Sequence, residues 1–153
     1  MFDVLVYLFQ NYYTPQACPT ADVLAKRLAA AGFEHDEIDD ALRWLMGLAE
    51  ATEDCVDLAQ YAGDGVRIYA SVEQQRLSPD AIGFITFLET TEVLAPPLRE
   101  IVIERAMACD DGVVNLTRIK VIALMVLWSQ EAEIDHLILE ELLRHHDGDE
   151  ICH

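Results

Sequence analysis

The chain has 153 residues, 52% of them apolar, which fits one domain or two very small ones with ample material for a core. Ten Lys and Arg face 28 Asp and Glu, for a formal net charge of −18. Because nucleic-acid binding draws much of its affinity from cations that release counterions, direct binding to DNA or RNA is disfavoured, as is an anionic membrane surface. A basic protein partner is compatible with this charge, which also keeps an apolar-rich chain soluble.

The location of the protein is predicted from its cysteines and its apolar stretches. No secretory signal precedes the first helix, because an acid, Asp3, stands where a basic segment would be needed. The longest apolar stretch, from Val121 to Trp128, is far shorter than the roughly 20 residues that cross a bilayer. We therefore expect a cytoplasmic protein without a membrane segment, with its four scattered cysteines reduced. These are Cys18, Cys55, Cys109 and Cys152.

Helical spacing of apolar residues predicts a first helix over 2–13, which Pro15 terminates. Thr20 or Asp22 can cap a second helix, and Gly32 suits its C-terminal end. The buried face of the second helix is expected to hold Val23, Leu24, Leu28 and Ala31.

A third helix is predicted from about Glu34, after a tight turn at Gly32 and Phe33. Its expected buried stripe is Ile38, Ala41, Leu42, Leu45 and Leu48, with Trp44 at the edge. A helix, a tight turn and a second helix have the sequence shape of a helix-turn-helix, and a following strand at 66–69 would make the unit winged-helix-like. A DNA reader places basic or amide side chains at the start of its second helix. Here that start is acidic, with Glu34, Asp36, Glu37, Asp39 and Asp40.

Further helices are predicted in the second half. Ser78, Pro79 and Asp80 form a strong start signal for a helix that runs to about Glu92. Others are expected at about 97–109, at 117–129 with Asn115 or Thr117 as cap, and at 133–145. The 117–129 helix is apolar on all sides and should be the central buried helix. Two short strands, 66–69 and 113–116, are the β candidates, and the two could pair.

These elements predict a mainly α protein with at most one short β element. Residues 1–70 would form an N-terminal three-helix, winged-helix-like unit, and 71–146 a C-terminal helical bundle. Residues 147–153 would form a flexible tail.

The sequence carries no recognisable catalytic or metal-binding pattern. The sequence contains no nucleophile elbow, Walker loop or dinucleotide fingerprint, and its acids fall on helix faces expected to be solvated. His145, His146, Cys152 and His153 are ligand types near the C-terminus, but they lack the spacing of a structural zinc site. We therefore predict no catalytic residue, no cofactor and no metal.

Aromatic residues at the end of the first helix are the candidate interface: Tyr12 and Tyr13 beside a loop, with Tyr7 on the other face of that helix. Aromatic residues next to loops are common at protein interfaces. The alternative is that Tyr12 packs inward and Tyr13 covers the helix end.

The opening, from Met1 to Tyr13, resembles the start of the bacterial Smg protein family. Agreement continues through 31–34, 37–38, 41–42, 44–45, 67–69, 83–84, 87–89, 98–100, 119–120 and 124–127, so that the resemblance covers nearly the whole chain. The resemblance implies no catalytic or binding residue. Genes of the family often lie beside those for a DNA-processing protein and a type I topoisomerase, which implies a loose association with DNA metabolism.

We therefore expect a non-enzymatic protein–protein interaction module whose partner, compatible with a basic surface, is unidentified. The alternative is a winged-helix-like regulator of DNA processing or topology that contacts DNA directly or through a basic partner. A continuous cationic strip formed by Lys26, Arg27, Arg43 and Arg67 would favour the alternative. The sequence predicts no oligomeric state.

Overall fold

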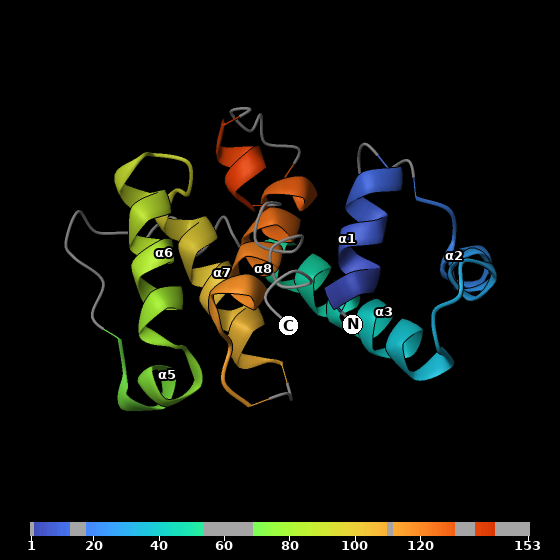
Figure 1. Cartoon of the computed structure of the whole chain (residues 1–153), viewed down its shortest axis with the longest axis horizontal. Helices are drawn as coiled ribbons and strands as arrows, with labels where there is room; N and C mark the ends of the chain where they lie inside the picture. The colour runs from blue at the N-terminus through green and yellow to red at the C-terminus, as the bar shows by residue number, and fades with distance from the viewer. Residues whose placement is uncertain (1, 13–17, 54–68, 110–111, 131–136, 143–153) are drawn as a thin grey trace.

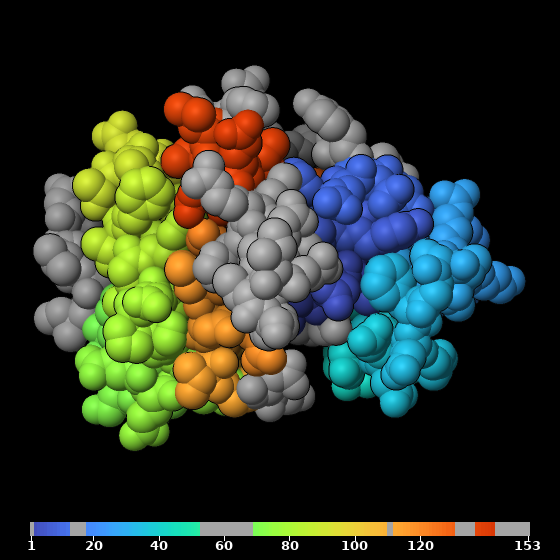
Figure 2. All heavy atoms as spheres, in the orientation of Figure 1, coloured from blue at the N-terminus to red at the C-terminus, as the bar shows by residue number. Residues whose placement is uncertain are grey.

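The computed structural model describes residues 2–12, 18–53, 69–109, 112–130 and 137–142. Over these residues the protein is mainly helical, which confirms the predicted fold class. Three N-terminal helices gather at one end of the molecule, and the helices after residue 70 form the other (Figures 1 and 2).

A buried helix lies between these two groups. α8 (Leu116–Ser129) begins at Asn115, whose side-chain oxygen accepts a hydrogen bond from the Arg118 amide at 3.0 Å. Every residue from 119 to 128 is buried. The helix packs against α1, α6 and α7, and Figure 1 shows it between them. The prediction of a central buried helix is confirmed.

The N-terminal group contains α1 (Phe2–Asn11), α2 (Ala21–Ala30) and α3 (His35–Glu53). α1 and α2 both pack on α3. The chain turns from α2 into α3 at Gly32, whose φ of 105° is in the left-handed region that glycine tolerates. The Phe33 amide donates back to the Leu28 carbonyl at 3.2 Å and so closes the end of α2.

The second group contains α5 (Ser71–Arg76), α6 (Pro79–Thr90), α7 (Pro96–Met107) and a helical segment over 137–142. The predicted start of α6 is confirmed, because the Ser78 hydroxyl accepts a hydrogen bond from the Ala81 amide at 3.1 Å. The sequence patterns did not predict α5. The segment 137–142 is the described part of the helix expected over 133–145, and the predicted tail 147–153 lies outside the described residues.

One hydrophobic core joins the two groups. α3 packs on α7 and α8, and α1 packs on α8. The core therefore contains Leu5 and Leu48 from before residue 70 and Ile101 and Ile122 from after it. The boundary at residue 70 stays a prediction about sequence segments, and these segments share one core.

The expected strand over 113–116 is wrong. Within the described residues, β structure is limited to one isolated bridge between Leu77 and Val114, and Leu116 already belongs to α8. The physical reason is the cap: Asn115 starts α8, which leaves only Val113 and Val114 before the helix, and Val114 is the one that pairs. Residues 66–68 of the other strand candidate lie outside the described residues.

Three expectations about burial are also wrong. Val23, predicted to face the core, is 41% exposed, and Ala31 is exposed as well, because α2 presents Leu24 and Leu28 to α3 instead. Trp44, predicted at the edge of the stripe, is 5% exposed, because α7 covers it.

Candidate functional site

An open pocket of about 490 Å³ lies between α1 and α2. Two of the three predicted interface residues, Tyr7 and Tyr12, line it, and Tyr13 lies outside the described residues. Among the described residues, its lining consists of Tyr7, Asn11, Tyr12, Arg27, Ala30 and Ala31. Tyr7 lies on α1 and Tyr12 directly follows it. Both side chains therefore reach the same space, although the sequence pattern had assigned them to different faces of the helix.

The hollow follows from how the helices are supported. Both α1 and α2 pack on α3, so neither needs to fill the space between them. Beside Arg27, the C-terminal end of α2 contributes two methyl groups there, from Ala30 and the capping residue Ala31. Small side chains on one wall and large phenols on the other leave an accessible space.

The wall formed by α1 is held in place. The Tyr7 ring meets Phe33 edge-on, with ring centroids 5.4 Å apart, which ties α1 to the turn between α2 and α3. The Asn11 side-chain amide donates to the Tyr7 carbonyl at 2.7 Å. The Trp128 indole donates to the Tyr12 carbonyl at 3.1 Å and so fixes the end of α1 to α8. Tyr7 and Tyr12 are therefore presented by a backbone with defined contacts.

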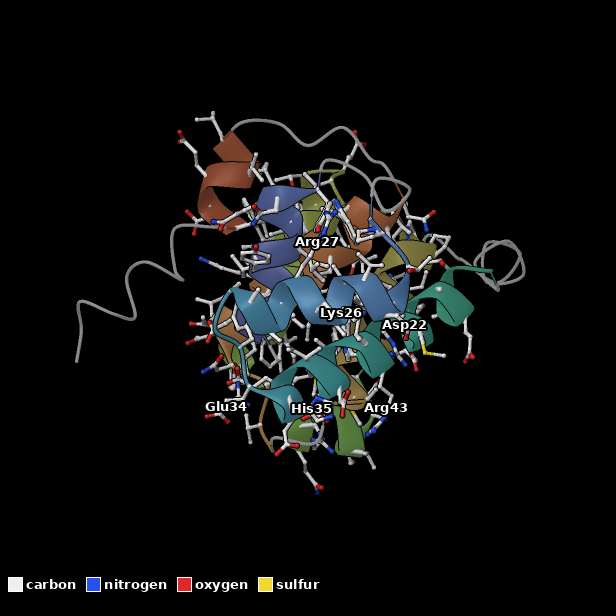
Figure 3. The ribbon with its side chains drawn as sticks, turned by 90° about the vertical axis from the view of Figure 1, so that its right-hand side faces the viewer. Asp22, Lys26, Arg27, Glu34, His35 and Arg43 are labelled. Carbon is white, nitrogen blue, oxygen red and sulfur yellow. The ribbon has the colours of Figure 1, made fainter. Side chains whose placement is uncertain are left out.

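Of the described residues that line the pocket, Arg27 alone is charged, and sequence reasoning did not single it out. Its Nη1 donates to the Tyr12 hydroxyl at 3.3 Å, across 15 residues of sequence. Figure 3 shows Arg27 on the side of α2 nearer α1, whereas the neighbouring Lys26 lies on the outward side of the helix. The contact depends on how α2 docks, so no local pattern could have revealed it.

The other described cations are largely used inside the protein. Arg99, Arg105 and Lys120 are buried, and Arg76 donates from Nε to the Gly112 carbonyl at 3.0 Å. Burial lowers the pKa of Arg99, but hydrogen bonds to Glu100 and Glu89 and the charges of both carboxylates outweigh it, so the pKa lies above its ordinary value.

Among the described residues, the exposed Lys and Arg are Lys26, Arg27 and Arg43, on α2 and α3. Figure 3 shows them interspersed with Asp22 and Glu34. Arg43 also lies 4.0 Å from the Asp40 carboxylate. The described cations therefore do not form the continuous strip that a nucleic-acid surface would need, and Arg67 lies outside the described residues.

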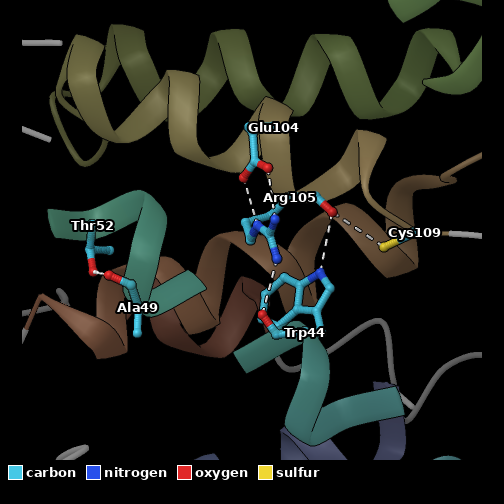
Figure 4. A network of polar contacts seen from close by, with 6 residues as sticks. All are labelled: Trp44, Ala49, Thr52, Glu104, Arg105 and Cys109. Carbon is cyan, nitrogen blue, oxygen red and sulfur yellow. Dashed lines mark hydrogen bonds and ion pairs between the residues drawn. The ribbon is translucent and has the colours of Figure 1, made fainter. Parts of the chain in front are cut away.

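A second polar cluster joins α3 to α7 (Figure 4). Arg105 donates from Nη1 to the Trp44 carbonyl at 3.0 Å and from Nε and Nη2 to the Glu104 carboxylate at 2.6 and 2.7 Å. The Trp44 indole donates to the Arg105 carbonyl at 3.2 Å. These reciprocal bonds are buried and fix one helix against the other, so we assign the cluster to the architecture.

The described residues that could bind a metal ion are scattered. Among the described residues, no group of three or more His, Cys, Asp or Glu side chains is placed to hold a metal ion. The residues His145, His146, Cys152 and His153 lie outside the described part of the chain. The Cys109 thiol donates a hydrogen bond to the Arg105 carbonyl at 3.4 Å, and burial raises the pKa of Cys18. None of the helices in the described ranges has the length and apolar character needed to cross a bilayer.

The fold and the pocket define an acidic, helical protein with an aromatic pocket that contains one arginine. Residues 1–153 match the family model described as "Protein of unknown function (DUF494)". The chain is 70% identical over 143 residues to a Protein Smg homolog of Bordetella avium, covering 94% of each chain. It is 53% identical to a Protein Smg homolog of Aromatoleum aromaticum, covering 94% of this chain and 92% of the relative. It is 47% identical to a Protein Smg homolog of Methylibium petroleiphilum over the full length of both chains. The chain belongs to the Smg family, as the sequence resemblance predicted. No solved structure matches it.

Proposed function

We propose that this protein is a non-enzymatic protein–protein interaction module of the bacterial cytosol that binds its partner through the pocket between α1 and α2. The observation that carries the proposal is the convergence of two phenols and one guanidinium, Tyr7, Tyr12 and Arg27, on one open space. Tyr and Arg are enriched among the residues that dominate binding energy at protein interfaces.

The size of the pocket supports anchoring of a partner's side chains. A space of about 490 Å³ is within the range that holds a small molecule or a few side chains, and the fixed backbone of α1 keeps its wall preformed. A preformed site loses less conformational entropy on binding than a mobile one. The surrounding helix surfaces would supply the rest of the contact area.

A second candidate, a winged-helix-like regulator of DNA processing or topology, has one observation in its favour. α2, the tight turn at Gly32 and α3 follow one another as the helices of a DNA-binding motif do. The first turns of α3, however, are acidic, with Asp36 and Glu37. Carboxylates there would meet the phosphates of DNA, which favours contact through a basic partner over direct contact.

A pair of alanines allows a matched test of the pocket. Ala29 and Ala30 are adjacent, exposed residues in the last turn of α2, and only Ala30 lines the pocket. Both positions tolerate a large side chain on the helix surface, but Ala30→Trp would fill the pocket and Ala29→Trp would not. Immobilised wild-type protein and each variant are used to capture proteins from a lysate of a bacterium that carries the gene.

The proposal expects at least one protein that wild type and Ala29→Trp retain and Ala30→Trp loses. Equal retention by all three proteins would show that the pocket is not the interface. A gel-shift titration with duplex DNA at low and physiological salt tests the second candidate. Tight binding that weakens steeply with salt would favour direct DNA contact over our proposal.

A further inference from the structure

We propose that the pocket between α1 and α2 binds a carboxylate group on a protein segment whose flanking residues are basic. The inference rests on the proposed function and specifies the chemistry of the partner. It is carried by the placement of Arg27, by the hydrogen-bonding groups around it and by the charge of the surface beyond the pocket.

Arg27 differs in its contacts from the four described cations that pair with carboxylates. Arg43, Arg99, Arg105 and Lys120 each lie within 4.0 Å of an Asp or Glu carboxylate. Arg27 is instead placed against the Tyr12 hydroxyl, and none of the lining residues that the structure describes is an acid. A guanidinium in a pocket without a carboxylate favours a ligand that brings one.

The hydrogen-bonding groups fit a carboxylate. Arg27 has five N–H donors in a planar fork, and the described contact with Tyr12 uses one of them. The Tyr12 hydroxyl accepts from Arg27, so its own O–H is available as a donor. The fork and the phenol together can donate to both oxygens of a carboxylate, which has no hydrogen to donate when ionised. A cationic side chain would meet repulsion from Arg27 at the same place.

The surface around the pocket restricts the rest of the ligand. With a formal net charge of −18, and with Asp22 on the same helix as Arg27, a run of acidic residues would be repelled. Lys and Arg on either side of a single carboxylate would be attracted to this surface and would speed association. The favoured ligand therefore combines one acid with basic neighbours.

Peptide titrations of the ¹⁵N-labelled full chain, followed by NMR, test the inference. The probe is the acetylated and amidated heptapeptide Lys-Lys-Ala-Glu-Ala-Lys-Lys, and its control replaces Glu by Gln. We expect the Glu peptide to bind wild type about fivefold more tightly than the Gln peptide, the difference that one exposed ion pair supplies. The largest shifts should fall at Tyr7, Asn11 and Tyr12. A further peptide, with all-basic side chains and a free C-terminal carboxylate, distinguishes a chain terminus from a Glu side chain.

Two neighbouring substitutions separate the pocket from the general charge. Arg27→Gln and Lys26→Gln each remove one exposed cation from α2, and only Arg27 lines the pocket. Arg27→Gln should abolish the fivefold preference for Glu, and Lys26→Gln should preserve it. Circular dichroism of both variants confirms that they are folded.

Equal affinities of wild type for the Glu and Gln peptides, an unchanged preference in Arg27→Gln, or no shifts at the pocket would each overturn the carboxylate inference. The capture experiment with Ala30→Trp is independent of ligand charge. A loss of captured protein there, together with a failed peptide titration, would leave the interaction module standing and exclude this ligand chemistry.

Discussion

Gly47 allows α3 and α7 to approach each other closely. A Cβ atom at this position would lie 2.8 Å from Cζ and 2.9 Å from Nη2 of Arg105, a side chain held in place by the Trp44 carbonyl and the Glu104 carboxylate. In a helix, Ala is favoured over Gly by about 1 kcal/mol. Displacing Arg105 would cost roughly 1.5–3 kcal/mol for a buried, charge-assisted hydrogen bond. We therefore expect Gly47→Ala to lower the free energy of unfolding by about 0.5–2 kcal/mol in urea titrations.

Gly83 provides the matched control for this prediction. It also lies within a helix, α6, but no atom lies within 4 Å of the position its Cβ would take. Gly83→Ala should therefore stabilise the protein by about 0.5–1 kcal/mol through helix propensity alone. If Gly47→Ala stabilised the protein as Gly83→Ala does, Arg105 would not be fixed as the structure shows.

The pKa of Cys18 leads to a prediction about its reactivity. Burial raises the pKa of this thiol, so less of the reactive thiolate is present at a given pH than in the unfolded chain. The folded state therefore holds the thiol proton more tightly than the unfolded chain does. The contribution of this proton to the free energy of unfolding is present below the pKa of the thiol in the unfolded chain, and it is lost as pH rises through the pKa in the folded protein. At about pH 8, iodoacetamide should modify Cys18 more slowly in the native protein than in urea. Peptide mass spectrometry resolves this site from other thiols, and equal rates in both states would contradict the burial.

Helix caps give a prediction at the scale of the elements. Ser78 caps α6 with a hydrogen bond from Ala81 at 3.1 Å, whereas Thr20 precedes α2 without a side-chain cap bond. Ser78→Ala should lower the free energy of unfolding by about 1 kcal/mol, since the Ala81 amide loses its acceptor. Thr20→Ala should change it by only a few tenths of a kcal/mol. Thermal unfolding followed by circular dichroism measures both, and comparable losses would contradict the assigned caps.

The same caps explain which elements were predictable. Ser78 and Asn115 are local signals: a polar residue, a helical apolar pattern and a hydrogen bond within three residues. α5 gave no such signal, because its six residues are too few for a periodic pattern and it follows Ala70. Its start is stabilised instead by the Glu73 carboxylate, which accepts from the Ala70 amide at 2.8 Å.

Burial was predicted less well than helix formation, because it depends on packing between elements. The pattern of α3 places Trp44 at the edge of the stripe, but α7 extends the buried surface around it and supplies the Arg105 carbonyl as hydrogen-bond acceptor. The candidate pocket likewise combines residues that a local pattern indicates with one that only the packing of the helices brings in. Aromatic residues beside a loop indicated Tyr7 and Tyr12, whereas the contribution of Arg27 follows from the docking of α2 and has no local signature.

At the scale of the whole molecule, several cations are buried whereas many acids lie at the surface. Arg99, Arg105 and Lys120 are buried with carboxylate partners, while acids such as Asp22, Asp36 and Asp80 remain at the surface. The described surface is therefore more acidic than the composition alone implies. Exposed like charges repel one another over roughly 30 Å at 10 mM salt and under 10 Å above 0.15 M.

This distribution predicts that salt stabilises the fold. Raising NaCl from about 10 mM to about 0.5 M at neutral pH should raise the Tm by a few degrees, because screening weakens repulsion among surface acids more than attraction in the buried pairs of Arg99 and Lys120. The control is the same series near pH 5, closer to the sequence pI of about 4.3, where the net charge is smaller and the gain should shrink. Calorimetry at both pH values measures the effect. A Tm that falls with salt at neutral pH would mean that attraction between surface ion pairs outweighs repulsion among surface acids. The electrostatic reason for expecting basic residues around the bound carboxylate would then be lost.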